Sequence, residues 1–132
     1  MTVRDLNDEV DVAQGLVPAA RTNGTFNGAA VDLRGYDSAT LVASFGAYTD
    51  GTHTPFLQYS DDGVSFAAAA ANEISGAFAA ISSGAGANSV QRVGAVGGHR
   101  YVRAVLTVTG ATSGAVSEML VLRGTPHRAP LA

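Results

Sequence analysis

The strongest structural signal in the sequence is a period-two alternation between Tyr101 and Thr109. Every second residue from Val102 to Val108 is apolar and would point to one face. The other face would carry Tyr101, Arg103, Val105, Thr107 and Thr109. Alternation of this kind in β-branched residues is typical of a strand with one buried face. We therefore predict a half-buried strand here, with Leu106 facing the core.

Similar short apolar or alternating segments recur along the chain, separated by turns rich in Gly. They predict strands over residues 14–20, 29–33, 39–45, 56–60, 89–96 and 115–122, with a further short one at 64–67. About seven or eight strands at this spacing favour an all-β fold, an antiparallel β-sandwich of the jelly-roll or immunoglobulin-like kind. The Ala-rich segment 66–73 is ambiguous, and we expect an irregular crossing there with room for one helical turn.

Two turns predict hairpins between neighbouring strands. The segment Gly110–Gly114 would join Tyr101–Thr109 to residues 115–122 in an antiparallel pair. The dipeptide Gly97–Gly98 suits a two-residue turn between residues 89–96 and the strand that begins at Tyr101.

The 132 residues fit one domain with short extensions. We predict an N-terminal arm at 1–9, a β-sandwich domain at 10–124 and a C-terminal tail at 125–132, which has two prolines that cannot continue a ladder. Such ends are usually frayed, and the alternative is that they become ordered on a partner. The polar, acidic start does not resemble a signal peptide, and no run of roughly 18 apolar residues predicts a membrane span, so we expect soluble synthesis inside the cell.

The stretch SDDGVSF at residues 60–66 could be a turn, a cation site or an Asp-box, the motif that repeats in sialidase-like propellers. Gly63 allows a positive φ, and Asp61 and Asp62 readily bond to nearby backbone, so a hairpin turn explains all three residues. A calcium site needs more oxygens than this segment supplies. The likeness to an Asp-box is loose, because the segment is one residue short and occurs once. We predict a turn.

The sequence lacks the residue patterns that common catalytic and metal-binding sites require. The chain has no Cys, which excludes disulfides and thiolate chemistry. His53, His99 and His127 all lie in or beside predicted turns, where histidines are mostly solvated. No nucleophile elbow, phosphate loop or placed carboxylate pair is present. We therefore expect no catalytic residue, no cofactor and no metal site, and a protein that is not an enzyme.

Charge is unusually scarce, at 14% of residues against roughly 25% in typical soluble domains. The net charge of −3 gives no reason to expect nucleic-acid or membrane binding. A charge-poor surface favours coverage by other chains, although small residues can also face water.

Arginines form the one basic concentration and supply the candidate partner contacts. Arg92 and Arg103 would share a face if their strands were adjacent, either as a solvated face or as donors to carboxylates on a neighbouring subunit. The full set of partner-interface candidates is Arg34, Arg92, Arg100 and Arg103, with Pro126, His127 and Arg128 in the tail.

Five stretches together resemble a group of small tailed-phage virion proteins encoded beside capsid genes. They are VDLRGYD (31–37), GAYTDGTHTP (46–55), LQYSDDG (57–63), VQRVG (90–94) and RYVRAVLTVTG (100–110). The resemblance spans about residues 28–125 and lies in the order of turns and strands. It implies a β-sandwich that decorates or cements the outside of an icosahedral head, often as a trimer, and it carries no catalytic residues.

The expectation is therefore a non-enzymatic virion structural protein, a capsid decoration protein. Its partners would be the major capsid protein and further copies of itself, as a homotrimer, on the capsid surface of a virion assembled in the host cytoplasm. One alternative is a head–tail connector, tail or fibre component. Another is a carbohydrate- or cell-surface-binding module that uses loops 48–53 and 59–66, and a hydrolase is the least favoured.

Overall fold

The computed structural model describes residue 7 and residues 9–126, and these residues contain no α-helix. The strands are joined by connections that include the 3₁₀ turns η2 (Ala71–Glu73) and η3 (Gly84–Gly86). The strands are β1 (Val10–Arg21), β2 (Gly24–Asn27), β3 (Val31–Asp32), β4 (Tyr36–Tyr48), β5 (Thr52–Ser60), β6 (Ala67–Ala68), β7 (Ile74–Ser75), β8 (Val90–Ala95), β9 (Tyr101–Thr109) and β10 (Ala115–Pro126).

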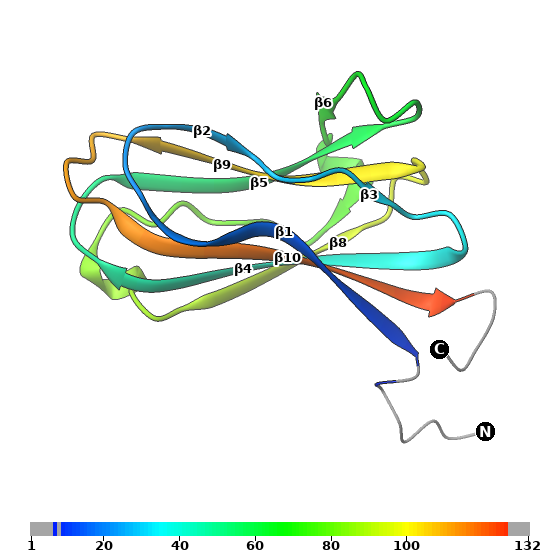
Figure 1. The fold of residues 1–132 in the computed structure, drawn as a ribbon, viewed down its shortest axis with the longest axis horizontal. Coiled ribbons are helices and arrows are strands. Elements are labelled where there is room, and N and C mark those ends of the chain that lie inside the picture. The colour runs from blue at the N-terminus through cyan, green and yellow to red at the C-terminus, as the bar shows by residue number, and fades with distance from the viewer. Residues whose placement is uncertain (1–6, 8, 127–132) are drawn as a thin grey trace.

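The strands form two antiparallel sheets that lie face to face (Figure 1). Sheet A has the order β1-β10-β4-β8-β7, and sheet B has the order β2-β9-β5-β6, with β3 also paired to β9. The predicted all-β antiparallel sandwich is confirmed. No described segment forms a helix with the length and apolar character needed to cross a bilayer.

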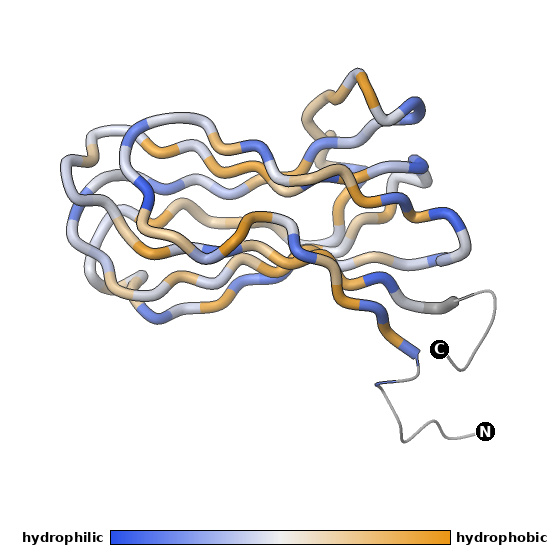
Figure 2. The backbone as a smooth tube through the Cα atoms, viewed as in Figure 1, coloured by the Kyte–Doolittle hydropathy of each residue, from blue (hydrophilic) through white to orange (hydrophobic). Residues whose placement is uncertain are grey.

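The core fills the space between the sheets and follows the alternation along each strand. Leu41 and Met119 of sheet A meet the same apolar cluster as Leu57 and Leu106 of sheet B. In β9, Val102, Ala104, Leu106 and Val108 are buried, as the sequence pattern predicts, and Val105 on the opposite face is buried as well. Figure 2 shows the apolar residues concentrated along the strands of both layers and the polar residues mostly in the connections.

The hairpins predicted at Gly97–Gly98 and at Gly110–Gly114 are both wrong. Strand β9 lies in sheet B, whereas β8 and β10, which precede and follow it along the chain, lie in sheet A. A turn sequence indicates that the chain reverses, but it does not say into which sheet the chain returns. Sheets in a sandwich are only about 10 Å apart, so a connection of a few residues can cross from one to the other.

Several strand boundaries also differ from the prediction. Strand β2 was not predicted, because it is only four residues long, begins with Gly24 and has a single large apolar residue, Phe26. The strand expected at 64–67 is the two-residue β6, which pairs with Gln58 and Tyr59 of β5. The single helical turn allowed at 66–73 is η2. Strand β10 continues past residue 124, and its last residue, Pro126, lies opposite Tyr36.

Candidate interaction surfaces

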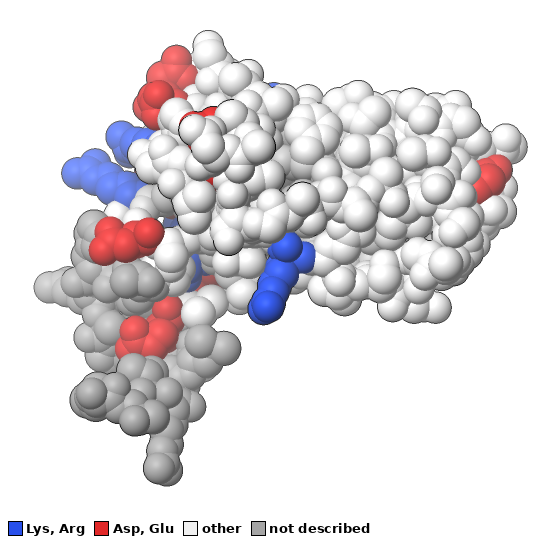
Figure 3. Space-filling view, turned by 180° about the vertical axis from the view of Figure 1, so that it is seen from behind, with Lys and Arg blue, Asp and Glu red and all other residues white. Residues whose placement is uncertain are grey.

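Charged side chains gather at one end of the sandwich, which we call the charged end. Figure 3 shows most of the blue and red residues of this face at that end, while the long body of the face is nearly free of charge. The connections β3–β4 and β8–β9 meet here, and β1 begins and β10 ends here as well (Figure 1).

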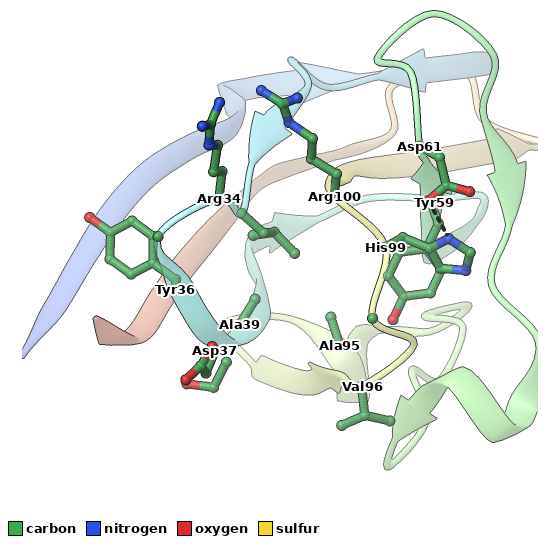
Figure 4. Close-up of a pocket in the computed structure, with 14 residues that line it drawn as sticks. Arg34, Tyr36, Asp37, Ala39, Tyr59, Asp61, Ala95, Val96, His99 and Arg100 are labelled. Atoms are coloured by element: carbon green, nitrogen blue, oxygen red, sulfur yellow. Dashed lines mark hydrogen bonds and ion pairs between the residues drawn. The ribbon is translucent and has the colours of Figure 1, made fainter. Parts of the chain in front are cut away.

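An open pocket of about 560 Å³ lies between these connections (Figure 4). Residues 33–39 form one side, residues from the β8–β9 connection form another, and Tyr59 and Asp61 line it from the end of β5. Arg34 and Arg100 extend side by side at its rim, and His99 lies beside Tyr59 and Asp61. The predicted interface residues Arg34 and Arg100 are therefore brought together, although they are far apart in the sequence.

Arg100 and Arg123 are both held by carboxylates from other strands. Arg100 donates to both oxygens of Asp32, at 3.2 and 3.0 Å, and lies over the ring of Tyr101. This ion pair lowers the pKa of Asp32 and raises that of Arg100. Arg123 binds Asp11 and donates to the backbone oxygen of Asp32 at 2.9 Å, which ties β10 to β1 and β3.

Arg34 differs from these two arginines. Its backbone amide donates to Asp32 Oδ1, but its guanidinium forms no hydrogen bond with any described residue. It is exposed at the rim of the pocket. Among the arginines that the structure describes at this end, it is therefore the one most available to a partner.

His99 lies between two carboxylates at the charged end. Its Nδ1 is 2.9 Å from Asp61 Oδ1, its Nε2 is 2.5 Å from Glu73 Oε2, and its ring lies 4.6 Å from that of Tyr59. The hydrogen bonds to Asp61 and Glu73 raise the pKa of His99. The histidine joins the β8–β9 connection to β5 and η2. It was expected to be solvated, but its side chain is only 29% exposed.

The turn predicted after β5 is confirmed. Gly63 has a φ of 78°, and Asp62 Oδ1 accepts hydrogen bonds from the amides of Val64 and Ser65 and from the hydroxyl of Ser60. These bonds, with that from the Ser65 amide the largest, lower the pKa of Asp62 to about 2. Asp62 is thus committed to its own turn. Among the described residues, no group of three or more His, Asp or Glu side chains is arranged to hold a metal ion.

Arg92 and Arg103 do not share a face, which corrects the sequence interpretation. Arg92 lies in sheet A opposite Val42, whereas Arg103 lies in sheet B opposite Gln58. Arg103 donates to Gln58 Oε1 at 2.7 Å, and its guanidinium is 4.2 Å from the centre of the Phe66 ring. Arg103 is therefore occupied by its own sheet, while Arg92 is exposed.

The tail candidates are only partly covered by the structure. Pro126 is the last residue of β10, at the charged end. His127 and Arg128 lie outside the described residues.

His53 was expected to be a solvated turn residue, and this is wrong. It lies inside β5 and is fully buried, with Nε2 donating to the backbone oxygen of Asp50 at 3.0 Å. Its ring packs edge-on against Phe45 and Tyr48. The buried Nδ1 has no hydrogen-bond partner among the described residues. His53 is a core residue and is closed to ligands from outside.

Arg21 is a buried residue that sequence reasoning missed. It is 6% exposed, and its guanidinium donates to Ser117 Oγ at 3.1 Å and to the backbone oxygen of Val17 at 2.6 Å. Burial lowers the pKa of Arg21, and no carboxylate pairs with it among the described residues. Nothing in the local sequence distinguishes it from an exposed arginine at a strand end, because its acceptors come mainly from backbone.

Of the comparisons with known proteins, the one with solved structures gives a match, and that match is to the fold. No family model matches the chain, and no curated protein matches it. Among solved structures, the PBSX exported protein XepA superposes with a TM-score of 0.61 at 16% identity. The match covers 93% of this chain and 39% of that one, so the chain spans well under half of that protein. At this identity the likeness shows a shared fold.

Proposed function

We propose that this protein is a non-enzymatic structural protein of a phage virion, a capsid decoration protein that binds the major capsid protein on the outside of the head. The observation that carries the proposal is the partition of its surface. Arg34, Arg100 and the end of β10 meet at one end of the sandwich, and the rest of the face seen in Figure 3 has few charges.

Two independent similarities support a phage origin. The sequence stretches between residues 31 and 110 resemble virion proteins encoded beside capsid genes. The fold is shared with a phage-related protein, the PBSX exported protein XepA. XepA is named as an exported protein, without a capsid role, so the capsid assignment of this chain depends on the sequence resemblance and the surface.

The charged end is the surface we propose for the shell contact. Its ion pairs tie the β8–β9 connection to β3, through Arg100 and Asp32, and β10 to β1, through Arg123 and Asp11. Little ordering is therefore needed on binding. The guanidinium of Arg34 is exposed and can then form a charge-assisted hydrogen bond with a capsid carboxylate or carbonyl. Weak contacts at each copy add up on a shell because many copies bind at once.

The structure weakens the alternative of a carbohydrate-binding module. That reading needs exposed aromatic rings in loops 48–53 and 59–66, but His53 and Tyr59 are buried. The ring of Phe66 is covered on one face by Arg103. A connector or tail position uses the same kind of surface and differs in copy number.

Binding of the purified protein to undecorated heads tests the proposal. We expect saturable binding seen by electron microscopy as added density on the outer surface of the shell. Arg34→Ala should weaken binding about tenfold or more, because it removes a charged donor from the contact. Arg103→Ala is the matched control, since that arginine lies on the outer face of sheet B.

The proposal fails if heads bind no protein, or if the protein binds at the tail or the portal vertex. Equal binding by the Arg34→Ala and wild-type proteins would leave the shell as partner but remove the charged end as the contact.

A further inference from the structure

The two outer faces of the sandwich differ in chemistry. On sheet B, Thr54 of β5 lies opposite Thr107 of β9, which in turn lies opposite Thr25 of β2. Such a row of hydroxyl side chains is well suited to water. On sheet A about half of the corresponding outward positions are aliphatic.

The outward residues of sheet A follow from the register with its buried ones. Val93, Leu41, Met119 and Val121 point into the core, so their neighbours along each strand point outward. We call the resulting surface the A face. It consists of Val12, Gln14 and Ala20 of β1, Val116, Glu118, Leu120 and Leu122 of β10, Thr40, Val42 and Ser44 of β4, and Val90, Arg92 and Gly94 of β8.

The A face exposes apolar side chains on three of its strands, β1, β8 and β10. Val12, Val90 and Val116 are 59%, 68% and 40% exposed. With strands about 4.8 Å apart and outward residues about 6.8 Å apart along a strand, four strands and four rows give about 500 Å². This is the area of the whole face, in which aliphatic side chains lie among Gln14, Thr40, Ser44, Arg92 and Glu118. Exposed apolar side chains gathered on one face of a sheet favour an interaction site.

Only two charges lie among these residues of the A face, and their positions are complementary under a two-fold rotation. Arg92 of β8 and Glu118 of β10 flank the central strand β4, opposite Val42 and Ser44 respectively. Neither forms an ion pair with a described residue. They are offset by two residues, about 7 Å, along the strand direction.

We propose that the A face is the contact between two copies of this chain, packed sheet against sheet about a two-fold axis that runs along β4. That axis places β8 of one copy over β10 of the other, so Arg92 of each copy meets Glu118 of its partner. Aligned sheets pack about 10 Å apart, a gap and offset that these two long side chains can span. A self-complementary patch is what a two-fold interface requires.

The area buried between the two A faces indicates how stable the dimer would be. Two faces of this size bury about 1,000 Å² in total, at the lower limit for a specific interface, so the dimer should depend on concentration. The inference does not rest on the capsid proposal, because the pairing uses a different surface from the charged end. It differs from the trimer that the phage resemblance implies, since a three-fold ring joins two unlike patches.

Sedimentation velocity and light scattering of the full chain test the pairing. We expect the mass to rise from 13.3 kDa towards about twice that value as concentration increases. Leu120→Glu should abolish the rise, whereas Thr54→Glu on the outer face of sheet B should leave it unchanged. Thermal unfolding of each variant shows whether it is folded.

Charge reversal gives the sharper test. Arg92→Glu and Glu118→Arg should each weaken dimerisation about tenfold or more, because each places like charges across the interface. The double variant should restore it. A protein that stays monomeric at near-millimolar concentration, forms a trimer, or forms a dimer insensitive to these changes would overturn the proposal. So would a monomer whose binding to heads is lost on Leu120→Glu, which would assign the A face to the shell instead.

Discussion

The carboxylate of Asp50 accepts a hydrogen bond from the backbone amide of Gly114 at 2.7 Å, which joins the β4–β5 turn to the β9–β10 turn. The same carboxylate accepts from the amides of Thr112 and Ser113. These bonds, with that from Gly114 the largest, lower the pKa of Asp50. Both turns cross between the sheets, so this contact fixes the end of the sandwich opposite the charged end.

The first prediction concerns the two glycines of the β9–β10 turn. Gly114→Ala should destabilise the fold far more than Gly110→Ala. Both residues have positive φ, at 74° and 66°, which alone costs an alanine about 1–2 kcal/mol. A Cβ at Gly114 would also lie 1.7 Å from the backbone oxygen of Arg21, whereas nothing lies within 4 Å of one at Gly110.

Urea unfolding of the two variants measures this difference. Equal losses would mean that the turn does not pack against the end of β1 as described.

The second prediction tests the faces of β9. Leu106 is fully buried in the core, so Leu106→Ala should lower the free energy of unfolding by about 2–5 kcal/mol. Thr107 points outward and is only partly buried, so Thr107→Ala should cost much less. Chemical denaturation checks both, and similar losses at the two positions would show that the faces are reversed.

How much of this fold could be predicted depends on whether the signal was local. The strand Tyr101–Thr109 was predicted to the residue, because its alternation reports burial on one side. The partners of that strand could not be predicted, because β2 and β5 pair with it from distant parts of the chain. Thus the layers followed from the sequence and the topology did not.

At the charged end, too, features with a local sequence signal were predicted and those that depend on long-range contacts were not. Asp61, Asp62 and Gly63 were predicted as a turn from their own chemistry, and the structure agrees. The contact of His99 with Glu73 depends on the β8–β9 connection crossing over η2, which no local pattern indicates. His53 was wrongly predicted to be solvated, because the turn that precedes it ends earlier than expected and β5 already begins at Thr52.

The third prediction is a pH dependence that originates from His99. Its pKa is raised above 6.5 in the folded protein, because the charged form is bonded to Asp61 and Glu73. The stabilisation is therefore complete below pH 6.5 and is lost as the pH rises through the folded pKa. The melting temperature of the wild type should fall over this range relative to that of His99→Gln.

The difference in melting temperature between the two proteins isolates His99 from the other titrating groups. If that difference stayed constant with pH, the assignment to His99 would be contradicted.

The fourth prediction concerns acid stability and Asp62. Its pKa falls from 3.8 to about 2 on folding, so its stabilisation is present above pH 3.8 and lost as the pH approaches 2. Asp62→Asn keeps an oxygen that can accept from Val64 and Ser65 but removes the titration. The variant should melt at a lower temperature near neutral pH and lose less on acidification, as followed by circular dichroism. If acidification lowered the melting temperature of Asp62→Asn as much as that of the wild type, Asp62 would not contribute to the acid dependence of stability.

The number of copies per virion tests the central claim most directly. A capsid decoration protein occupies symmetry-related sites over the whole shell, so quantitative mass spectrometry of purified particles should find on the order of hundreds of copies, in fixed ratio to the major capsid protein. A count of about a dozen or fewer, the number expected at a single vertex or tail, would contradict the account.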